Sequence, residues 1–374
     1  MGTLSWTFTL LALNGALMAV LLAAVRNHRA AHRFLAALVG LISLRLAIYV
    51  LGFAGVYDDH PWITFAPLDA SLAFGPLLWL YIETLTRGAP PRRWGLHLVP
   101  AILQLAYYGA AFALPLERKL EWFRGPHLEW MQPIGLVALL ASCTLYLALS
   151  WRRQRGYQRW LDDRFSDRER WRLGWMTGIL VAFAATLSLA MVAAIVNATV
   201  MPVDYFGRSP VMVASSLLAY ALGLLGWRHA ALDLPAQPSE AREPDTPGPR
   251  TSRPASVFPA WASRVEAEGW WREEGLTLSQ LASRLGTSER TLSRGLSEGA
   301  GCNFNTFVNG LRVQAVMRAI AGGAREDLLS LALGHGFSSK ASFNRAFLRH
   351  TGTTPSRWRA SGSQIPPIEA PGVS

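Results

Sequence analysis

Cysteine is scarce in this sequence, and the sites that need several cysteines are therefore not expected. Its 374 residues include two, Cys143 in an apolar run and Cys302 in a more polar part of the chain. Neither has a second cysteine nearby or the spacing of a zinc site, which argues against a disulfide framework and a metal site. Both are interpreted as small buried apolar residues.

Motifs for catalysis are missing as well. The sequence has no His/Glu metal motif, no GxSxG motif, no phosphate-binding glycine loop and no paired carboxylates on one helical face. We therefore expect no enzymatic activity, no cofactor and no metal.

Acidic residues are outnumbered, with 25 Asp and Glu against 36 Lys and Arg and a net charge of +11. Such a balance indicates an anionic partner, either a phosphate backbone or lipid headgroups, and does not distinguish the two. The first 230 or so residues are mostly long apolar segments, whereas the last 120 or so have the composition of a soluble domain. We therefore expect at least two domains.

Seven apolar windows are long enough to cross a bilayer, which requires about 20 residues. They are 4–25, 34–56, 64–86, 95–114, 131–150, 173–197 and 209–227. Arginine is concentrated in the first, third and fifth loops between them, and the fifth holds seven arginines between Trp151 and Trp171. Because positively charged loops stay in the cytoplasm, we expect a multi-pass membrane protein with its N-terminus outside and residue 228 onward inside.

Besides Glu83, two charged residues lie within these windows, Arg45 in the second and Asp69 in the third. A charge at that depth costs at least a few kcal/mol, so both should face the bundle interior and lie close together. The pair is interpreted either as part of a sensor site or as a structural contact between helices. Glu83, four residues before Arg87, is expected to form an ion pair at the membrane interface.

Six prolines between Asp233 and Ser256 predict a semi-rigid tether that cannot bury a core. The expected fold is all-α, a seven-helix transmembrane bundle followed by a soluble helical domain. The expected order is a sensor domain at 1–230, a linker at 231–256, a DNA-binding domain at 257–361 and a disordered tail at 362–374.

Two helix–turn–helix patterns follow the linker. In TLSQLASRLG, Thr277 and Gln280 fit a capping box and Gly286 fits a left-handed stop, and a second helix follows in TSERTLSRGLSE. The arrangement recurs with Asp327 as the cap of DLLSLALGHG and Ser338 or Ser339 at the start of SKASFNRAFLRH. A longer apolar helix, NTFVNGLRVQAVMRAIAGG, lies between the two patterns. Two DNA-reading helices joined by one connecting helix would fit successive major grooves of DNA, about 34 Å apart.

These residues resemble the C-terminal DNA-binding domain of the AraC/XylS family of bacterial transcription regulators over positions 276–359. The matching positions are Leu292, Arg294, Leu296, Gly301, Leu311, Arg312, Leu331, Ala332, Gly336, Phe337, Phe343, Arg345, Phe347, Gly352, Thr354, Pro355 and Arg359. Gly295 and Gly334 depart from the pattern by putting weak helix formers inside helices. The resemblance implies sequence-specific binding of double-stranded promoter DNA.

The residues that would read bases lie on the exposed face of each second helix. They are Arg290, Ser293 and Arg294 in the first unit and Lys340, Asn344 and Arg345 in the second. Arg and Lys donate to guanine, and Asn pairs with adenine. The resemblance places these residues at base edges and Ser288, Ser338, Ser339 and Arg349 nearer phosphates. The alternative for each cation is a solvated surface position, whereas Phe343, Phe347 and Trp358 are expected in the core.

We interpret the sequence as a membrane-bound one-component transcription regulator, with its DNA-binding domain controlled by the membrane half. The resemblance implies that the membrane is the bacterial inner membrane. The expected partners are promoter DNA, the lipid bilayer, RNA polymerase, a second copy of the chain, and an unidentified small-molecule or envelope signal. The alternative is a membrane receptor or transporter whose soluble helical domain binds protein.

Overall fold

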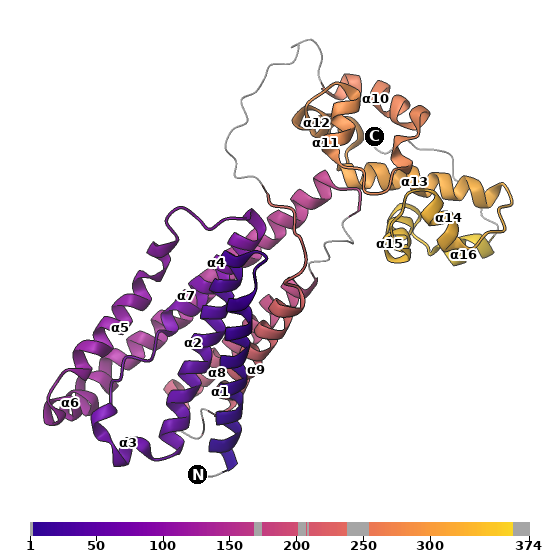
Figure 1. The fold of residues 1–374 in the computed structure, drawn as a ribbon. Helices are drawn as coiled ribbons and strands as arrows, with labels where there is room; N and C mark the ends of the chain where they lie inside the picture. The colour runs from indigo at the N-terminus through magenta and orange to yellow at the C-terminus, as the bar shows by residue number, and fades with distance from the viewer. Residues whose placement is uncertain (1–2, 168–173, 201–206, 208, 238–253, 362–374) are drawn as a thin grey trace. The chain divides into compact units, whose positions relative to one another are not determined.

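The computed structural model describes residues 3–167, 174–200, 207, 209–237 and 254–361. Within these ranges all regular elements are helices, which confirms the all-α fold class (Figure 1). The chain divides into two compact units, one formed by Met1–Arg155 and Leu173–Ser239, the other by Gly156–Arg172 and Glu240–Ser374. The predicted tail and positions 238–253 of the predicted linker lie outside the described residues.

Helices of very different length build the first unit. They are α1 (Thr3–Ala24), α2 (Arg29–Phe53), α3 (Val56–Asp59), α4 (Phe74–Arg87), α5 (Val99–Phe112), α6 (Leu116–Trp122), most of α7 (Gln132–Arg164), α8 (Gly174–Thr199) and α9 (Ser209–Arg228). Short 3-10 turns cover Pro61–Ile63, Ser71–Ala73 and Trp94–Leu98, and a π-helical stretch, Phe123–Met131, leads into α7.

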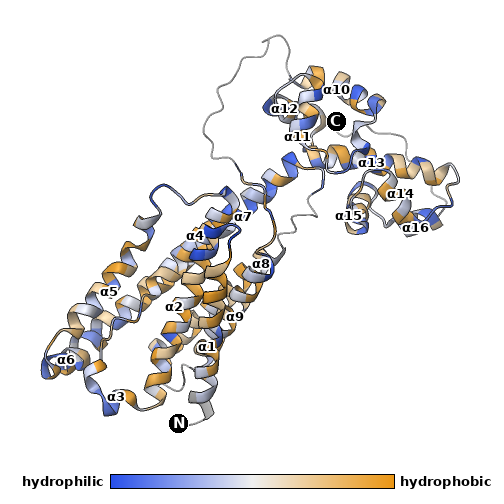
Figure 2. Cartoon of the chain, in the orientation of Figure 1, coloured by the Kyte–Doolittle hydropathy of each residue, from blue (hydrophilic) through white to orange (hydrophobic). Residues whose placement is uncertain are grey.

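Six helical segments among the described residues are long and apolar enough to cross a membrane. They are Trp6–Ala24, Arg29–Phe53, Trp94–Phe112, Leu116–Arg164, Gly174–Thr199 and Ser209–Arg228. Many of their apolar side chains are exposed, and hydrophobic residues run the length of α1, α2 and α9 (Figure 2). A soluble surface rarely carries so much contiguous apolar area, so this unit is compatible with a membrane-spanning region.

The third predicted window, 64–86, is not one long helix, and this part of the prediction was wrong. Only its second half is helical, as the 14-residue α4, which is about 21 Å long and shorter than the hydrocarbon core. The Asp69 carboxylate accepts the Ser71 main-chain N–H at 2.9 Å, a local hydrogen bond that competes with helix formation. Eleven residues of α4 are buried, so the apolarity of this window reflects packing inside the bundle.

Hydrogen bonds and ion pairs within the first unit connect its loops and helix ends to one another. The Glu83 carboxylate lies 3.0 Å from Nε of Arg153, and Nη1 of Arg153 donates to Oε1 of Gln237 at 2.9 Å. These contacts join the end of α4 and the chain that follows α9 to the polar part of α7. Elsewhere in this unit, Nζ of Lys119 donates to the carbonyl oxygen of Trp62 at 2.9 Å, which joins the loop after α2 to α6.

Two small cores build the second unit, and one helix contributes to both. Its elements are α10 (Pro254–Glu268), a 3-10 turn (Trp270–Arg272), α11 (Leu278–Leu285), α12 (Glu289–Ala300), α13 (Phe304–Ala321), α14 (Leu328–Gly334), α15 (Lys340–Thr351) and α16 (Pro355–Ala360). Val308 of α13 belongs to the core with α10, α11 and α12, whereas Val316 belongs to the core with α14, α15 and α16. Helix α13 is therefore the connector that the sequence predicts (Figure 1).

Two glycines permit close approaches in this unit. A Cβ on Gly295 would lie 2.7 Å from the Trp261 ring, so its absence allows α10 to pack against α12. A Cβ on Gly336 would lie 2.5 Å from the Arg272 carbonyl oxygen, and φ at Gly336 is +88°. The departure from the family pattern at Gly295 thus has a packing reason, because α10 fills the space that a side chain would need.

Candidate DNA interface

The boundaries of the helix–turn–helix units are set by local capping. Thr277 and Gln280 form the predicted capping box, with the Gln280 N–H 3.2 Å from the Thr277 hydroxyl and the Thr277 N–H 2.9 Å from Oε1 of Gln280. Gly286 ends α11 in the left-handed conformation, with φ of 65°. Ser288 and Ser339 then cap α12 and α15, each accepting a main-chain N–H from the residue three positions later. These caps confirm the predicted starts of both second helices.

In α12 the predicted reading residues lie on the side opposite the core. Leu292 and Leu296 are buried, whereas Arg290 and Arg294 are exposed and Ser293 is half-buried. Nε of Arg294 lies 3.3 Å from the carboxylate of Glu298, one turn along the helix. An exposed pair of this kind contributes little to stability and can exchange for a base or a phosphate.

In α15 the division between core and surface is equally clear. Phe343 and Phe347 are buried in the second core with Trp358 of α16, as expected. Lys340, Asn344, Arg345 and Arg349 are exposed, and Ser338 and Ser339 are half-buried. The helix therefore presents a cationic outer face.

The Asp327 carboxylate holds the start of α14. It accepts the main-chain N–H groups of Ser330 at 3.2 Å and Leu329 at 3.1 Å. These hydrogen bonds stabilise the ionised carboxylate and lower the pKa of Asp327 below its ordinary value.

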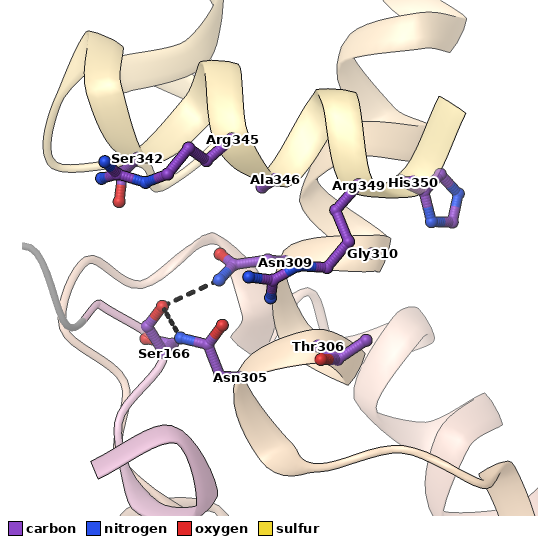
Figure 3. A pocket seen from close by; sticks show the side chains of 10 residues that line it. All are labelled: Ser166, Asn305, Thr306, Asn309, Gly310, Ser342, Arg345, Ala346, Arg349 and His350. Carbon is purple, nitrogen blue, oxygen red and sulfur yellow. Dashed lines mark hydrogen bonds between the residues drawn. The ribbon is translucent and has the colours of Figure 1, made fainter. Parts of the chain in front are cut away.

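A short stretch after α7 belongs to this unit. Ser166 is buried among side chains of α13: Nδ2 of Asn305 and Nδ2 of Asn309 each donate to its carbonyl oxygen at 2.9 Å (Figure 3). A cavity of about 90 Å³ lies beside it and is also lined by Arg345 and Arg349. The predicted reading face of α15 thus borders the site of Ser166.

Arg312 joins the two helix–turn–helix units from inside. It is 1% exposed, and it donates from Nε to the Trp271 carbonyl oxygen and from Nη2 to the Glu273 carbonyl oxygen, both at 2.7 Å. Its guanidinium carbon lies 5.8 Å from the centroid of the Phe337 ring. Burial lowers the pKa of Arg312 to about 10, and nearby carboxylates oppose this effect, so the side chain is charged at neutral pH.

The sequence analysis matched Arg312 only as a family position and did not find the site of Ser166. A signal was present, because Asn305, Asn309 and Arg312 recur at the i, i+4, i+7 spacing of one face of a mainly apolar helix. A polar stripe in such a helix indicates a polar neighbour, but it does not say which part of the chain that neighbour is.

In the first unit the expected proximity of Arg45 and Asp69 is confirmed. Nη1 of Arg45 lies 3.4 Å from Oδ1 of Asp69, and both side chains are about three-quarters buried or more. Gln104 is close by, with Oε1 accepting the Leu72 main-chain N–H at 3.0 Å and Nε2 donating to the Ser71 hydroxyl at 3.2 Å. Other polar groups thus surround the charged pair.

Two linked helix–turn–helix units with exposed cationic second helices define a DNA-binding transcription regulator. A family described as "Helix-turn-helix domain" matches residues 281–361. The chain is 33% identical over 94 residues to the probable transcription factor PqrA of Proteus vulgaris, which covers 25% of this chain and 75% of PqrA. It is 37% identical over 92 residues to an uncharacterized HTH-type transcriptional regulator of Staphylococcus aureus strain COL, which covers 25% of this chain and 12% of that protein. The chain therefore belongs to the transcription factors with an AraC-type helix-turn-helix domain. No solved structure matches it.

Proposed function

We propose that this protein is a membrane-bound one-component transcription regulator that binds promoter DNA through both helix–turn–helix units. The observation that carries the proposal is the shared connector: α13 packs into both cores, so α12 and α15 are presented by one rigid domain. Two DNA-reading helices held in this way would fit successive major grooves on one face of the duplex.

The roles of single residues follow from their places on the two helices. Arg290, Ser293 and Arg294 of α12, and Lys340, Asn344 and Arg345 of α15, are proposed to contact base edges. Ser288, Ser338 and Ser339 lie at or next to helix N-termini, where main-chain N–H groups and the helix dipole favour phosphate oxygens. Arg349, one turn beyond Arg345, is proposed as a further phosphate contact.

The apolar unit is proposed to span the inner membrane, with the second unit in the cytoplasm. Two observations support this orientation: the arginine-rich loops, and the contacts of Glu83 and Gln237 with Arg153 at the ends that carry those loops. The 64–86 segment completes the third crossing as irregular chain followed by α4, which burial inside the bundle permits. Reporter fusions at residues 58 and 160 are expected to report opposite sides of the membrane, and the same side for both would contradict the topology.

Further partners follow from this function. RNA polymerase is the proposed target of the bound regulator, and a second copy of the chain is a proposed partner on DNA. A small-molecule or envelope signal is proposed to act on the apolar unit at the pair formed by Arg45 and Asp69, because a buried charged pair responds strongly to a polar ligand.

The function is tested with the full-length protein in lipid nanodiscs and a random-sequence pool of duplex DNA. Enriched sites should contain two short blocks about one helical turn apart, and affinity should fall steeply with salt as counterions are released. Arg345→Ala should cost about 1–3 kcal/mol and relax the preference at one base position, whereas Arg349→Ala should weaken all sequences about equally. Arg357→Ala, an exposed arginine of α16, is the matched control. Folded protein without salt-dependent DNA binding would refute the proposal.

A further inference from the structure

Residues 164–167, here called the docked segment, lie at the end of α7 and just beyond it and are held by side chains of α13. Nδ2 of Asn305 donates to the carbonyl oxygens of Phe165 and Ser166, at 3.0 and 2.9 Å, and Nδ2 of Asn309 donates to that of Ser166. Ser166 is 2% exposed and Asn305 is 7% exposed. A short stretch of backbone is thus bound by the side-chain amides of one buried and one half-buried asparagine, which leaves few of its buried carbonyl oxygens unpaired.

The backbone of the docked segment is also paired on its other side. The Ser166 N–H donates to the Leu276 carbonyl oxygen at 3.2 Å, and Phe165 and Thr277 form an antiparallel bridge. Nη2 of Arg312 lies 3.4 Å from the Ser166 hydroxyl. Main-chain pairing on one side and side-chain donors on the other fix the register of the segment.

The docked segment reaches both second helices of the helix–turn–helix units. Arg164 pairs with Glu289, the first residue of α12, and Oδ1 of Asp167 accepts the Ser342 hydroxyl of α15 at 3.2 Å. Ser342, Arg345 and Arg349 follow one another at i, i+3 and i+7 and therefore share one face of α15.

That shared face of α15 is turned toward the docked segment, which it contacts at Ser342. Its three residues line the cavity beside Ser166 (Figure 3). The Asp167 carboxylate thus bonds to the side of α15 that carries two proposed DNA contacts, Arg345 and Arg349, so a phosphate approaching that side would meet like charge.

We propose that the polar face of α13 formed by Asn305, Asn309 and Arg312 is a binding site for residues 164–167 of the same chain, and that docking of this segment competes with DNA. The inference rests on the proposed function, because it assigns a regulation to the same reading face. Helix α7 is continuous from its apolar part to Arg164, so a displacement of that part would pull directly on the docked segment. Undocking would free the Ser342 hydroxyl and remove the Asp167 carboxylate from the side of α15 that carries the exposed Arg345 and Arg349.

The first test measures DNA affinity of the full-length protein in nanodiscs. Asp167→Asn and Asn305→Ala should bind DNA more tightly than wild type, by about two- to tenfold for each hydrogen bond lost. Asp163→Asn makes the same charge change one turn earlier in α7, and Gln314→Ala removes an amide from the opposite face of α13. These two controls should bind like wild type.

The second test locks the docked state. Asp167→Cys and Ser342→Cys are combined with Cys143→Ala and Cys302→Ala, so that only the new pair can form a disulfide. Oxidation should form the crosslink and weaken DNA binding at least about tenfold, as expected when the competent state is depopulated, and a reductant should restore it.

Each result supports or overturns a definite claim. DNA binding that neither the first variants nor the crosslink alters, or failure of the crosslink to form, would overturn the docking proposal and leave the regulator function intact. Failure of every reduced, folded protein to bind DNA would instead overturn the proposed function.

Discussion

Replacing Arg312 with methionine should strongly destabilise the second unit. Methionine keeps much of the apolar volume of the side chain but removes all its donors, so the Trp271 and Glu273 carbonyl oxygens each lose a hydrogen bond of 2.7 Å. Those carbonyls lie within and just after the 3-10 turn that precedes α11, and Arg312 ties this stretch to α13.

The magnitude follows from two opposing effects. Each carbonyl left without a donor costs about 1–3 kcal/mol, and the lost pairing with a charged donor places both toward the upper part of that range. Removing a buried charge recovers part of the cost, because a guanidinium is expensive to desolvate. The net loss should be about 3 kcal/mol, which lowers the melting temperature of a domain of this size by roughly 15 °C.

The assay is urea denaturation of a fragment covering residues 254–361, which contains both cores of the unit. Arg318→Met is the matched control, because it makes the same change on the same helix at a side chain that is 51% exposed and lies 3.4 Å from Glu266. The control should change the free energy of unfolding by less than about 0.5 kcal/mol. Equal, small effects of both substitutions would refute the view that Arg312 holds the two helix–turn–helix units together.

Three further predictions concern single contacts. Gly336→Ala should destabilise the same fragment by at least about 2 kcal/mol, because Gly336 has a positive φ and an added Cβ would lie 2.5 Å from a backbone atom. The control Gly301→Ala, with φ of 62° and open space around it, should cost about 1 kcal/mol. Similar melting curves for the two variants would contradict this. The lowered pKa of Asp327 means that its contribution to stability is present above the ordinary pKa and is lost as pH falls through the lowered value. Asp327→Asn should therefore flatten the loss of stability as pH falls below about 4, and parallel urea-denaturation profiles of the two proteins would rule this out. Arg45→Ala and Asp69→Ala should each lower the stability of the detergent-solubilised protein by about 3 kcal/mol or less. A double variant that exchanges the two residues should recover part of that loss. If the effects of the two single substitutions simply add in the double variant, the two charges are not coupled.

Much of the second unit could be predicted from the sequence because its signals are local. The capping box of Thr277 and Gln280, the left-handed stop at Gly286 and the caps at Ser288 and Asp327 each depend on residues within one helical turn. The apolar periodicity of the helices likewise determined which residues form the two cores. The exposed faces that carry the candidate DNA contacts followed by exclusion, since they are the sides left outside the core.

The apolar unit was harder to predict in detail, because apolarity does not separate lipid from protein as a neighbour. The 64–86 window has the composition of a span, yet α4 is short and buried, and Asp69 bonds to the backbone at Ser71 instead of continuing a helix. The closeness of Arg45 and Asp69 could be expected, because a lone charge is costly in hydrocarbon.

Composition and short-range pattern determined the two-part organisation of this protein and its pair of helix–turn–helix units, because those features are encoded within a few residues at a time. Only the tertiary structure decided that Gly295 makes room for α10, that Arg312 is buried between the units, and that Asn305 binds Ser166 across 139 residues of chain. Such contacts depend on which surfaces meet after folding. A polar stripe on a helix predicts a polar partner, but it does not identify the part of the chain that supplies this partner.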